Sequence, residues 1–294
     1  MLQLQDVTRR FGDLTAVDGV SFEVCDGLLT GFVGGNGAGK TTTMRTIMGL
    51  LALHGGRVLW QDRPITVADQ RRFGYMPEER GLYPKQSVID QLAYLGELHG
   101  LTSSAARGFA MTNLDQLGLA DRAKDHVEKL SLGNQQRVQI IAALLAEPQA
   151  LILDEPFSGL DPDAVDSMTA LLREHSSRGI PVLFSSHQLD LVERLCDRLV
   201  IMARGRVVAQ GTVAELKAGG PTRYRLALGG DAGWVRDWAR GTQAIDVDGR
   251  TALVEVLEPG AEQALVAEAV GRGPVHEFAR LVPALSEIYR EVTA

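Results

Sequence analysis

A glycine-rich segment that ends in a lysine and a threonine is the part of this sequence best suited to hold phosphate. Residues 34–41 fit the pattern G-x-x-x-x-G-K-S/T at every fixed position. Because glycine takes positive φ without steric cost, the N–H groups of such a loop can point at one spot, where the start of a following helix adds positive charge. Lys40 can reach the outer phosphates of a nucleotide, the Thr41 hydroxyl can ligate Mg²⁺, and Thr42 can bond an inner phosphate. The residues expected to bind the phosphates are Gly34, Gly35, Asn36, Gly37, Ala38, Gly39, Lys40, Thr41 and Thr42.

Two adjacent carboxylates provide the second chemical signal. Asp154 and Glu155 directly follow the apolar run at residues 150–153 and precede Pro156. A carboxylate at the end of a buried strand, beside a phosphate-binding loop, can hold Mg²⁺ directly or through water. The next carboxylate can polarise an attacking water. For this tripeptide alone, an ordinary charged exit from a strand is an open alternative, and its occurrence together with the loop favours the catalytic interpretation.

The elements predicted around these residues match that chemistry. Residues 28–33 predict a short buried strand and residues 41–50 a helix, which is the context that a phosphate-binding loop requires. A glycine-rich turn with an incidental lysine does not need this flanking pattern and is the less favoured alternative. Residues 1–30 alternate apolar and polar side chains between turn signals, which predicts antiparallel strands. The apolar runs at 150–153 and 181–184 predict parallel strands that are covered on both faces.

Two more segments complete the predicted organisation. From residue 88 to about 146, apolar residues recur at helical spacing, which predicts a block of helices inserted into an α/β domain. Residues 55–67 predict a strand, a turn and a second strand in which Pro64 limits pairing.

Glycine and proline at 219–221 predict a linker to a smaller C-terminal domain. After it, the segments predict the order strand, helix, strand, strand, helix, strand, with the first helix at 232–239. That order is typical of a ferredoxin-like split unit. We therefore expect a first domain at residues 1–218, with its helical subdomain at about 84–146, and an accessory domain at residues 221–294.

Composition and charge limit the classes of function. The chain has 294 residues, a net charge of −7 and a pI near 5.4, which argues against general nucleic-acid binding. Two cysteines, Cys25 and Cys196, do not support a disulfide framework, so we expect a reducing, cytoplasmic setting. The start of the chain lacks the apolar block of a signal peptide. The longest purely apolar run, residues 140–146, is far shorter than the ~18 residues that a spanning helix needs.

The third signal is residues 130–137, which read Leu-Ser-Leu-Gly-Asn-Gln-Gln-Arg. Together with the phosphate-binding loop and the paired carboxylates, this segment makes the chain resemble the ATP-binding subunit of an ABC transporter. It resembles the ABC signature but departs from the usual L-S-G-G-Q, because Leu132 replaces the first glycine and Asn134 replaces the glutamine. Ser131 and Gly133, which the family uses on the γ-phosphate, are kept.

Further motifs follow in the order that this family has. Phe11 falls where the family has an aromatic residue that stacks on adenine, and residues 158–161 resemble its D-loop, which ends in Asp161. His187 occupies the switch-histidine position after a predicted strand. The loop before the helical block normally carries a glutamine ligand for Mg²⁺, and Glu78 stands there in this sequence. A carboxylate oxygen suits Mg²⁺ at least as well as an amide oxygen.

The resemblance covers about residues 1–216 and implies both a fold and a mode of action. The implied fold is the α/β P-loop NTPase cassette of ABC proteins, with a mixed sheet core, an inserted helical subdomain and an N-terminal antiparallel β part. The accessory domain is expected to be α+β and ferredoxin-like. In this family two copies face each other head to tail, and each ATP lies between Lys40 of one copy and Ser131 and Gly133 of the other.

The resemblance also implies the roles of the remaining residues and the partners. Thr41, Glu78 and Asp154 would hold Mg²⁺, Glu155 would orient the attacking water, and His187 would contact the γ-phosphate. ATP-driven closure of the homodimer would drive a separate membrane permease, without any nucleic acid. The subunit would be cytoplasmic, peripheral on the inner face of the cell membrane.

The C-terminal tail resembles the small domain of a bacterial export-type subgroup that includes sodium and drug exporters. The loop at residues 78–84 and the ending at residues 283–289 support that placement. Resemblance in fold does not by itself identify a function such as ligand sensing. We therefore expect this domain to be a packing or dimer-stabilising module rather than a ligand sensor.

Three other classes of function compete with this interpretation. A soluble ABC ATPase that acts on ribosomes or DNA usually needs two cassettes or a long coiled coil, and this sequence has one phosphate-binding loop and no sustained heptads. A GTPase or small-molecule kinase would lack the signature segment, and a guanine-specifying motif does not occur. A module that only binds nucleotide would not need Glu155.

Overall fold

A computed structural model describes residues 1–79, 81–145 and 147–293. It divides into two units, Met1–Val213 and Ala214–Val292. The expected end of the helical subdomain at residue 146 and the last residue of the chain, 294, lie outside the described residues. So does Arg80, which belongs to the loop that supports the subgroup resemblance. The domain limits at residues 218 and 221 remain predictions.

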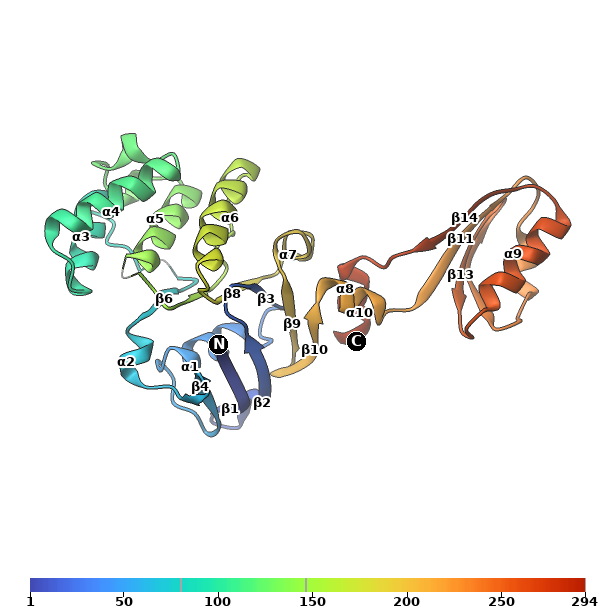
Figure 1. The fold of residues 1–294 in the computed structure, drawn as a ribbon, viewed down its shortest axis with the longest axis horizontal. Helices are drawn as coiled ribbons and strands as arrows, with labels where there is room; N and C mark the ends of the chain where they lie inside the picture. Colours follow the sequence, from blue (N-terminus) through green and yellow to red (C-terminus); the bar gives the residue numbers. More distant parts are fainter. Residues whose placement is uncertain (80, 146, 294) are drawn as a thin grey trace. The chain divides into compact units, whose positions relative to one another are not determined.

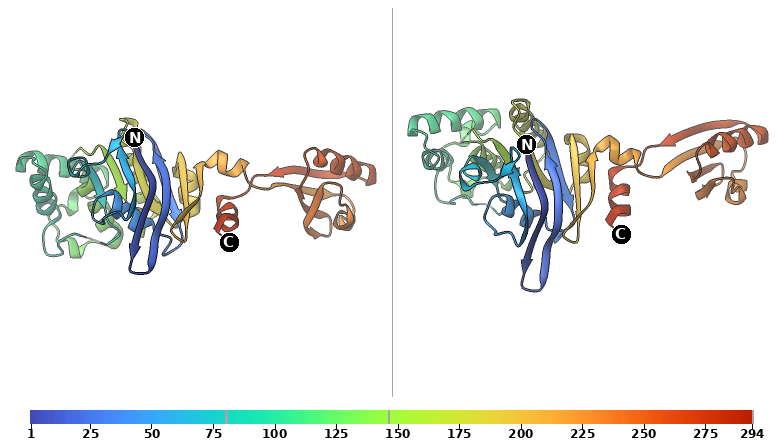
Figure 2. Two further views of the ribbon diagram at one scale, coloured as in Figure 1. Left: turned by 90° about the horizontal axis from the view of Figure 1, so that it is seen from below. Right: turned by 60° about the horizontal axis from the view of Figure 1, so that its bottom comes forward.

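The first unit begins with an antiparallel sheet whose strand order is β2-β1-β4-β5. Its strands are β1 (Leu2–Phe11), β2 (Leu14–Val24), β4 (Gly55–Trp60) and β5 (Arg63–Pro64). The long pairing of β1 with β2 is clear in Figure 2. Alternate residues such as Leu2 and Leu4 are buried, so the period of the apolar pattern is that of a sheet with one covered face. The predicted antiparallel N-terminal part is confirmed.

The second sheet of this unit carries the phosphate-binding loop, and its strand order is β10-β9-β3-β8-β7-β6. Its strands are β3 (Leu29–Gly34), β6 (Phe73–Met76), β7 (Ala150–Leu153), β8 (Val182–Ser186), β9 (Arg198–Ala203) and β10 (Arg206–Thr212). All neighbours pair in parallel except β9 and β10, so the sheet is mixed, as predicted. Every residue of β3, β7 and β8 is buried, which explains the continuous apolar runs of β7 and of residues 182–184 in β8. The buried polar side chains in these strands are those of Thr30, Ser185 and Ser186.

Helices connect these strands, and the predicted inserted block lies between β6 and β7 in the sequence. Its helices are drawn in shades of green in Figure 1. The helices of the unit are α1 (Lys40–Ile47), α2 (Val67–Gln70), α3 (Val88–Leu98), α4 (Ser103–Gln116), η1 (Ala120–Arg122), η2 (Val127–Lys129), α5 (Leu132–Leu144), α6 (Pro162–Ser177) and α7 (Leu189–Leu195). Cys25 and Cys196 are both free thiols, in agreement with the absence of a predicted disulfide framework.

The short helix α2 corrects the sequence prediction, which extended strand structure to residue 67. The strand β5 ends at Pro64, and Thr66 starts the helix with a capping box that it forms with Asp69. Arg63 donates two hydrogen bonds of 2.7 Å to the Asp69 carboxylate. Hydrogen bonds from Arg63 and Thr66 hold the pKa of Asp69 well below its usual range. The cap depends on a side chain three residues away, which a strand pattern does not reveal.

The second unit is built around an antiparallel sheet of order β12-β13-β11-β14. Its elements are α8 (Val213–Ala218), β11 (Thr222–Leu228), η3 (Gly233–Asp237), β12 (Thr242–Asp248), β13 (Thr251–Val256), α9 (Ala261–Arg272), β14 (Val275–Leu281) and α10 (Leu285–Thr293). The order of the strands is that of the expected split unit. The first helix is only the short η3 and does not fill the predicted 232–239, in line with the cost of the glycine at its start. Leu226, Val254 and Leu265 are fully buried in the core of this unit.

No helix within residues 1–79, 81–145 and 147–293 has both the length and the apolar character needed to cross a bilayer.

Candidate functional site

The order of the parallel strands brings four segments that are distant in sequence to one edge of the sheet. The strand β3 leads into the loop before Lys40, and β8, its neighbour, leads to His187. The next strand, β7, leads to Asp154 and Glu155, and β6, beyond it, leads to Glu78. The carboxyl ends of parallel strands lie on the same edge, which is where open α/β sheets bind their ligands.

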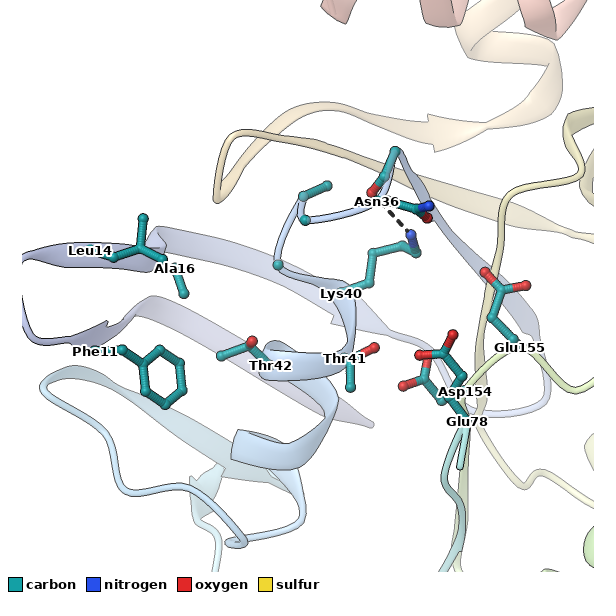
Figure 3. A pocket seen from close by; sticks show the side chains of 14 residues that line it. Phe11, Leu14, Ala16, Asn36, Lys40, Thr41, Thr42, Glu78, Asp154 and Glu155 are labelled. Atoms are coloured by element: carbon teal, nitrogen blue, oxygen red, sulfur yellow. Dashed lines mark hydrogen bonds between the residues drawn. The ribbon is translucent and has the colours of Figure 1, made fainter. Parts of the chain in front are cut away.

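A cavity of about 450 Å³ lies at this edge. It is lined by Phe11, Leu14, Ala16, Gly35, Asn36, Gly37, Ala38, Gly39, Lys40, Thr41, Thr42, Glu78, Asp154 and Glu155. Figure 3 shows Phe11, Leu14 and Ala16 at one end and the three acidic side chains at the other, with Lys40 and Thr41 between them. An apolar end joined to a polar end fits a molecule that has a flat base and a charged phosphate tail.

The loop itself has the backbone that its glycines predict. Gly37 and Gly39 have φ values of 76° and 104°, in the left-handed region that favours glycine. A Cβ atom on Gly39 would lie 2.5 Å from the carbonyl oxygen of Ala16, so this position has no room for a side chain. Gly39 also precedes the first turn of α1 and has no side chain to cap it, which leaves the N–H groups of that turn available for an anion.

The ammonium group of Lys40 lies inside this loop. Its Nζ atom donates hydrogen bonds to the carbonyl oxygens of Gly34, at 2.7 Å, and of Gly35, at 3.3 Å. Only 8% of the residue is exposed. Gly34 therefore contributes through its carbonyl group, whereas the other predicted residues of the loop line the cavity directly. Lys40 places a positive charge where the phosphates are expected.

Asp154 presents a carboxylate oxygen that fits a cation. The residue is 1% exposed, and its Oδ1 atom accepts a hydrogen bond of 2.6 Å from the Ser185 hydroxyl. Its Oδ2 atom is buried and has no hydrogen-bond partner among the described residues. An ionised oxygen in this position is costly unless a ligand compensates it. Thr41 and Glu78 supply further oxygen atoms to the same cavity.

These donors fit Mg²⁺ rather than a metal that needs an all-protein cage. The described residues contain no group of three or more histidine, cysteine, aspartate and glutamate side chains that could hold a metal ion. Mg²⁺ is usually bound through one or two carboxylates together with substrate phosphates and water. The residues present therefore suit a magnesium ion that arrives with a nucleotide.

The backbone of Glu155 is held on both sides of its Cα atom. Its backbone N–H donates to the Ser185 hydroxyl at 2.8 Å, and its carbonyl oxygen accepts a hydrogen bond of 2.7 Å from Gln136. Its φ of 51° lies in the left-handed region, which is uncommon for a residue with a side chain. Strained backbone of this kind is concentrated at functional sites.

The side chain of Glu155 pairs with the predicted histidine. His187 Nδ1 lies 2.9 Å from Glu155 Oε2. Burial raises the pKa of Glu155 above its ordinary value, while the charges and hydrogen bond of His187 and the charge of Lys40 oppose that rise. Both residues line a second cavity of about 450 Å³, together with Gly35, Asn36, Glu78, Gln136 and Ser158.

Besides Gly34, three predicted residues are not among those that line these two cavities: Ser131, Gly133 and Asp161. The Ser131 hydroxyl caps α5, and the Asp161 carboxylate caps α6 through the Ala164 N–H at 2.8 Å. A Cβ atom on Gly133 would lie 3.0 Å from the carbonyl oxygen of Gly159, so the signature segment packs closely on the D-loop segment of the same chain. One chain thus brings together only part of the predicted site.

Comparisons with known proteins identify the chain. A family model described as ABC transporter matches residues 17–158. The chain is 45% identical over 217 residues to the uncharacterized ABC transporter ATP-binding protein YhaQ of Bacillus subtilis, an alignment that covers 74% of this chain and 73% of the relative. The chain belongs to the ATP-binding subunits of ABC transporters.

Other comparisons agree with this assignment. The Nod factor export ATP-binding protein I of Burkholderia lata is 35% identical over 71% of this chain and 70% of its own length. A solved structure of an ATP binding subunit of an ABC transporter is 31% identical, with a TM-score of 0.68 over 74% of this chain and 92% of that one. A second family model, ATP-binding protein DrrA1-3-like, C-terminal domain, matches residues 211–293.

The predicted family, its α/β cassette fold and its subgroup with a small C-terminal domain are therefore confirmed. Members of the family bind ATP and hydrolyse it to power transport, so this ABC subunit is an ATPase.

Some residues of this ABC site were not predicted from the sequence. Leu14 and Ala16 line the apolar end of the cavity, and Gln136 and Ser185 hold the peptide of Glu155. Their only signals were proximity to motif residues, since Gln136 lies in the signature segment after Gly133 and Ser185 stands two residues before the switch histidine. Proximity in sequence does not tell which atoms they bind.

Proposed function

We propose that two copies of this ABC subunit close head to tail over ATP, in its Mg²⁺ complex, and drive a separate membrane permease in the direction of export. The observation that carries the proposal is the division of the site. The loop at Lys40, the acidic residues and Glu155 share one cavity, whereas Ser131 and Gly133 lie outside it. A second copy in head-to-tail arrangement would supply these two residues to the γ-phosphate. ATP would then stabilise the closed state through contacts that only this state makes.

Within each half of the dimer, the roles follow from chemistry and position. Phe11 would stack on the adenine, because it lines the apolar end of the cavity and remains 44% exposed. Thr41, Glu78 and Asp154 would hold the Mg²⁺ that neutralises the phosphates. Asp161 would act in the D-loop.

Glu155 and His187 would act at the γ-phosphate. The Glu155 carboxylate would orient and polarise the attacking water, since it borders both cavities. His187, paired with it, would contact the γ-phosphate. We further propose that the ATP-binding domain extends over residues 1–218 and the accessory domain over 221–294.

The permease and the direction of transport rest on relatives. ATP-binding subunits of this family work with membrane permeases, and one relative is named as a Nod factor export protein. We infer the same arrangement here, with the subunit cytoplasmic and peripheral on the inner face of the membrane. The match of the C-terminal unit to a DrrA1-3-like domain supports membership in the export-type subgroup.

Mixing two inactive variants tests the head-to-tail arrangement. Lys40→Ala and Ser131→Arg should each abolish turnover when present in both copies. In a mixed dimer, one site has an intact Lys40 loop and an intact Ser131, while the other has neither. Random exchange should therefore restore about a quarter of the parent rate, because half of the dimers are mixed and each has one complete site. Steady-state ATP turnover of the mixture measures this.

The matched controls are each variant mixed with a differently tagged copy of itself, which should stay inactive. If the two-variant mixture also stays inactive while pull-down shows that mixed dimers exist, both halves of a site come from the same chain. The head-to-tail proposal would then be wrong.

Isolation from native membranes tests the transport role. The tagged subunit should purify from detergent-solubilised membranes with a membrane-spanning chain in a fixed ratio, and its ATP turnover should rise in that complex. Glu155→Gln should keep the companion chain but lose the turnover. A subunit that is active and dimeric, yet purifies without any membrane chain, would contradict coupling to a permease.

A further inference from the structure

A buried serine contacts both residues of the acidic pair, Asp154 through its carboxylate and Glu155 through its backbone N–H. The parallel pairing of β7 with β8 places Leu153 opposite Phe184, so the next residues along the two strands are Asp154 and Ser185. Ser185 is fully buried. A polar side chain inside a sheet that is covered on both faces is stable only when its hydrogen bonds are satisfied.

The Ser185 hydroxyl group acts both as a hydrogen-bond donor and as an acceptor toward the acidic pair. Its single hydrogen is donated to Asp154 Oδ1 at 2.6 Å, and its oxygen accepts the backbone N–H of Glu155 at 2.8 Å. A hydroxyl group has only one proton to donate, so the direction of both hydrogen bonds is fixed. One atom of β8 therefore orients the Asp154 side chain and the peptide between Asp154 and Glu155, which directly follow β7.

The first contact decides which oxygen of Asp154 is available. Because Oδ1 is bound by the serine, the carboxylate cannot rotate freely, and Oδ2 is left without a hydrogen-bond partner among the described residues. Figure 3 shows this carboxylate beside Glu78 and facing Thr41. Oδ2 is therefore the oxygen of Asp154 that is available to a ligand in the nucleotide cavity, which Asp154 lines.

The second contact fixes the backbone of Glu155. The chain leaves the strand at this residue with a φ of 51°, and its N–H is paired with the serine side chain. The carbonyl group of the same residue is held by Gln136. The direction of the Glu155 side chain is set by this turn, since the side chain follows the backbone that carries it.

We propose that Ser185 is a positioning residue of the ATPase site, which presents Asp154 Oδ2 to the Mg²⁺ of the nucleotide and holds the turn that aims Glu155. This inference rests on the proposed roles of Asp154 and Glu155. Partners of metal ligands fix the orientation of those ligands, and their loss typically costs about 10- to 100-fold in metal affinity or activity.

The neighbouring serine provides a matched control. Ser186 is 2% exposed on the same strand, and its hydroxyl accepts the backbone N–H of Gln188 at 3.0 Å. Ser185→Ala and Ser186→Ala therefore remove the same group at nearly the same depth, but only the first touches the acidic pair. Ser185→Thr retains the hydroxyl and suits a strand.

The experiment compares ATP binding with and without metal in the full-length protein. Calorimetric titration with ATP in EDTA reports the phosphate-binding loop, and titration with Mg-ATP adds the contribution of the metal. Ser185→Ala should keep the affinity in EDTA, lose about 10-fold in the gain from Mg²⁺, and lower kcat by about 10- to 100-fold. Amide hydrogen exchange at Glu155, measured without nucleotide, should become faster in this variant. Ser186→Ala should match the parent, and Ser185→Thr should retain most of both properties.

Several outcomes would overturn the inference. Ser185→Ala with the parental gain from Mg²⁺ and parental exchange at Glu155 would show that the hydroxyl positions neither carboxylate. An equal loss of affinity in EDTA, or a Ser185→Thr protein as impaired as Ser185→Ala, would assign the effect to packing. If the parent itself gains no affinity from Mg²⁺, the proposed role of Asp154 fails instead, and the parent measurement distinguishes the two failures.

Discussion

Replacing Glu155 by glutamine is expected to lower ATP turnover by about 100- to 10,000-fold, the range that a positioned general base contributes. The amide has the size of the carboxylate, so the packing and the peptide contacts to Ser185 and Gln136 are retained. What is lost is the negative charge that polarises water. Because burial raises the pKa of Glu155 and the nearby His187 and Lys40 oppose that rise, the ionised form of this carboxylate depends on the charges around it.

The same variant is expected to accumulate the closed dimer with ATP. If the γ-phosphate holds two copies together and hydrolysis removes it, a protein that binds ATP but cannot hydrolyse it remains closed. Turnover assays and light scattering with and without Mg-ATP measure the two effects on one sample. We expect a monomer without nucleotide and a stable dimer with it.

Glu79→Gln is the matched control, since it makes the same chemical change in an exposed residue that is not among those lining the two cavities. It should leave turnover and assembly as in the parent. A Glu155→Gln protein that hydrolyses ATP at the parental rate would remove this residue from the mechanism. A Glu155→Gln protein that neither hydrolyses ATP nor dimerises would support the catalytic role of Glu155. The same result would contradict ATP-driven closure.

The sequence predicted most of the elements that carry the site, for a physical reason. Buried parallel strands need continuous apolar runs, and the residues that follow them are polar because they reach the edge of the sheet. The segment before Asp154 shows this pattern plainly, and the strand before Lys40 is buried at every residue although it contains Thr30. The family motifs then fixed which strand end carries which function.

The order of the strands was not predictable from such patterns. Nothing in the run at β8 (Val182–Ser186) tells that it lies between β3 and β7, yet this position brings Ser185 to Asp154 and Glu155. The left-handed backbone of Glu155 was not predictable either, because a propensity argument would not assign it to a glutamate. Contacts between distant segments therefore required the structure.

Local capping was missed for a different reason. At Thr66, a strand-like segment changes to helix within two residues because Asp69 forms a capping box with Thr66 and an ion pair with Arg63. The four residues of α2 are too few for a helical period to appear. Short elements of this kind are determined by particular side-chain contacts rather than by a repeating pattern.

Lys40→Ala is expected to abolish tight ATP binding, with a loss of about 10- to 100-fold or more in affinity. A hydrogen bond to a charged group contributes about 1.5–3 kcal/mol, and each 1.4 kcal/mol changes an equilibrium constant about tenfold. The measurement is equilibrium titration with ATP in EDTA, so that the metal contribution is absent. Lys129→Ala is the control, because it removes an exposed lysine that is not among the residues lining the cavity.

The position of Lys40 makes a second variant necessary. Its ammonium group donates hydrogen bonds to the carbonyl oxygens of Gly34 and Gly35. Alanine therefore removes two hydrogen bonds that stabilise the loop as well as a charge. Lys40→Met keeps an unbranched apolar side chain in this buried place but carries no charge. If the attraction between the Lys40 charge and the phosphates dominates the affinity, both variants lose ATP affinity to a similar extent. Their loss of affinity in EDTA then becomes smaller as added salt screens the phosphates. If Lys40→Met binds ATP as the parent does, Lys40 acts by filling the loop, and its assignment to the phosphates is wrong.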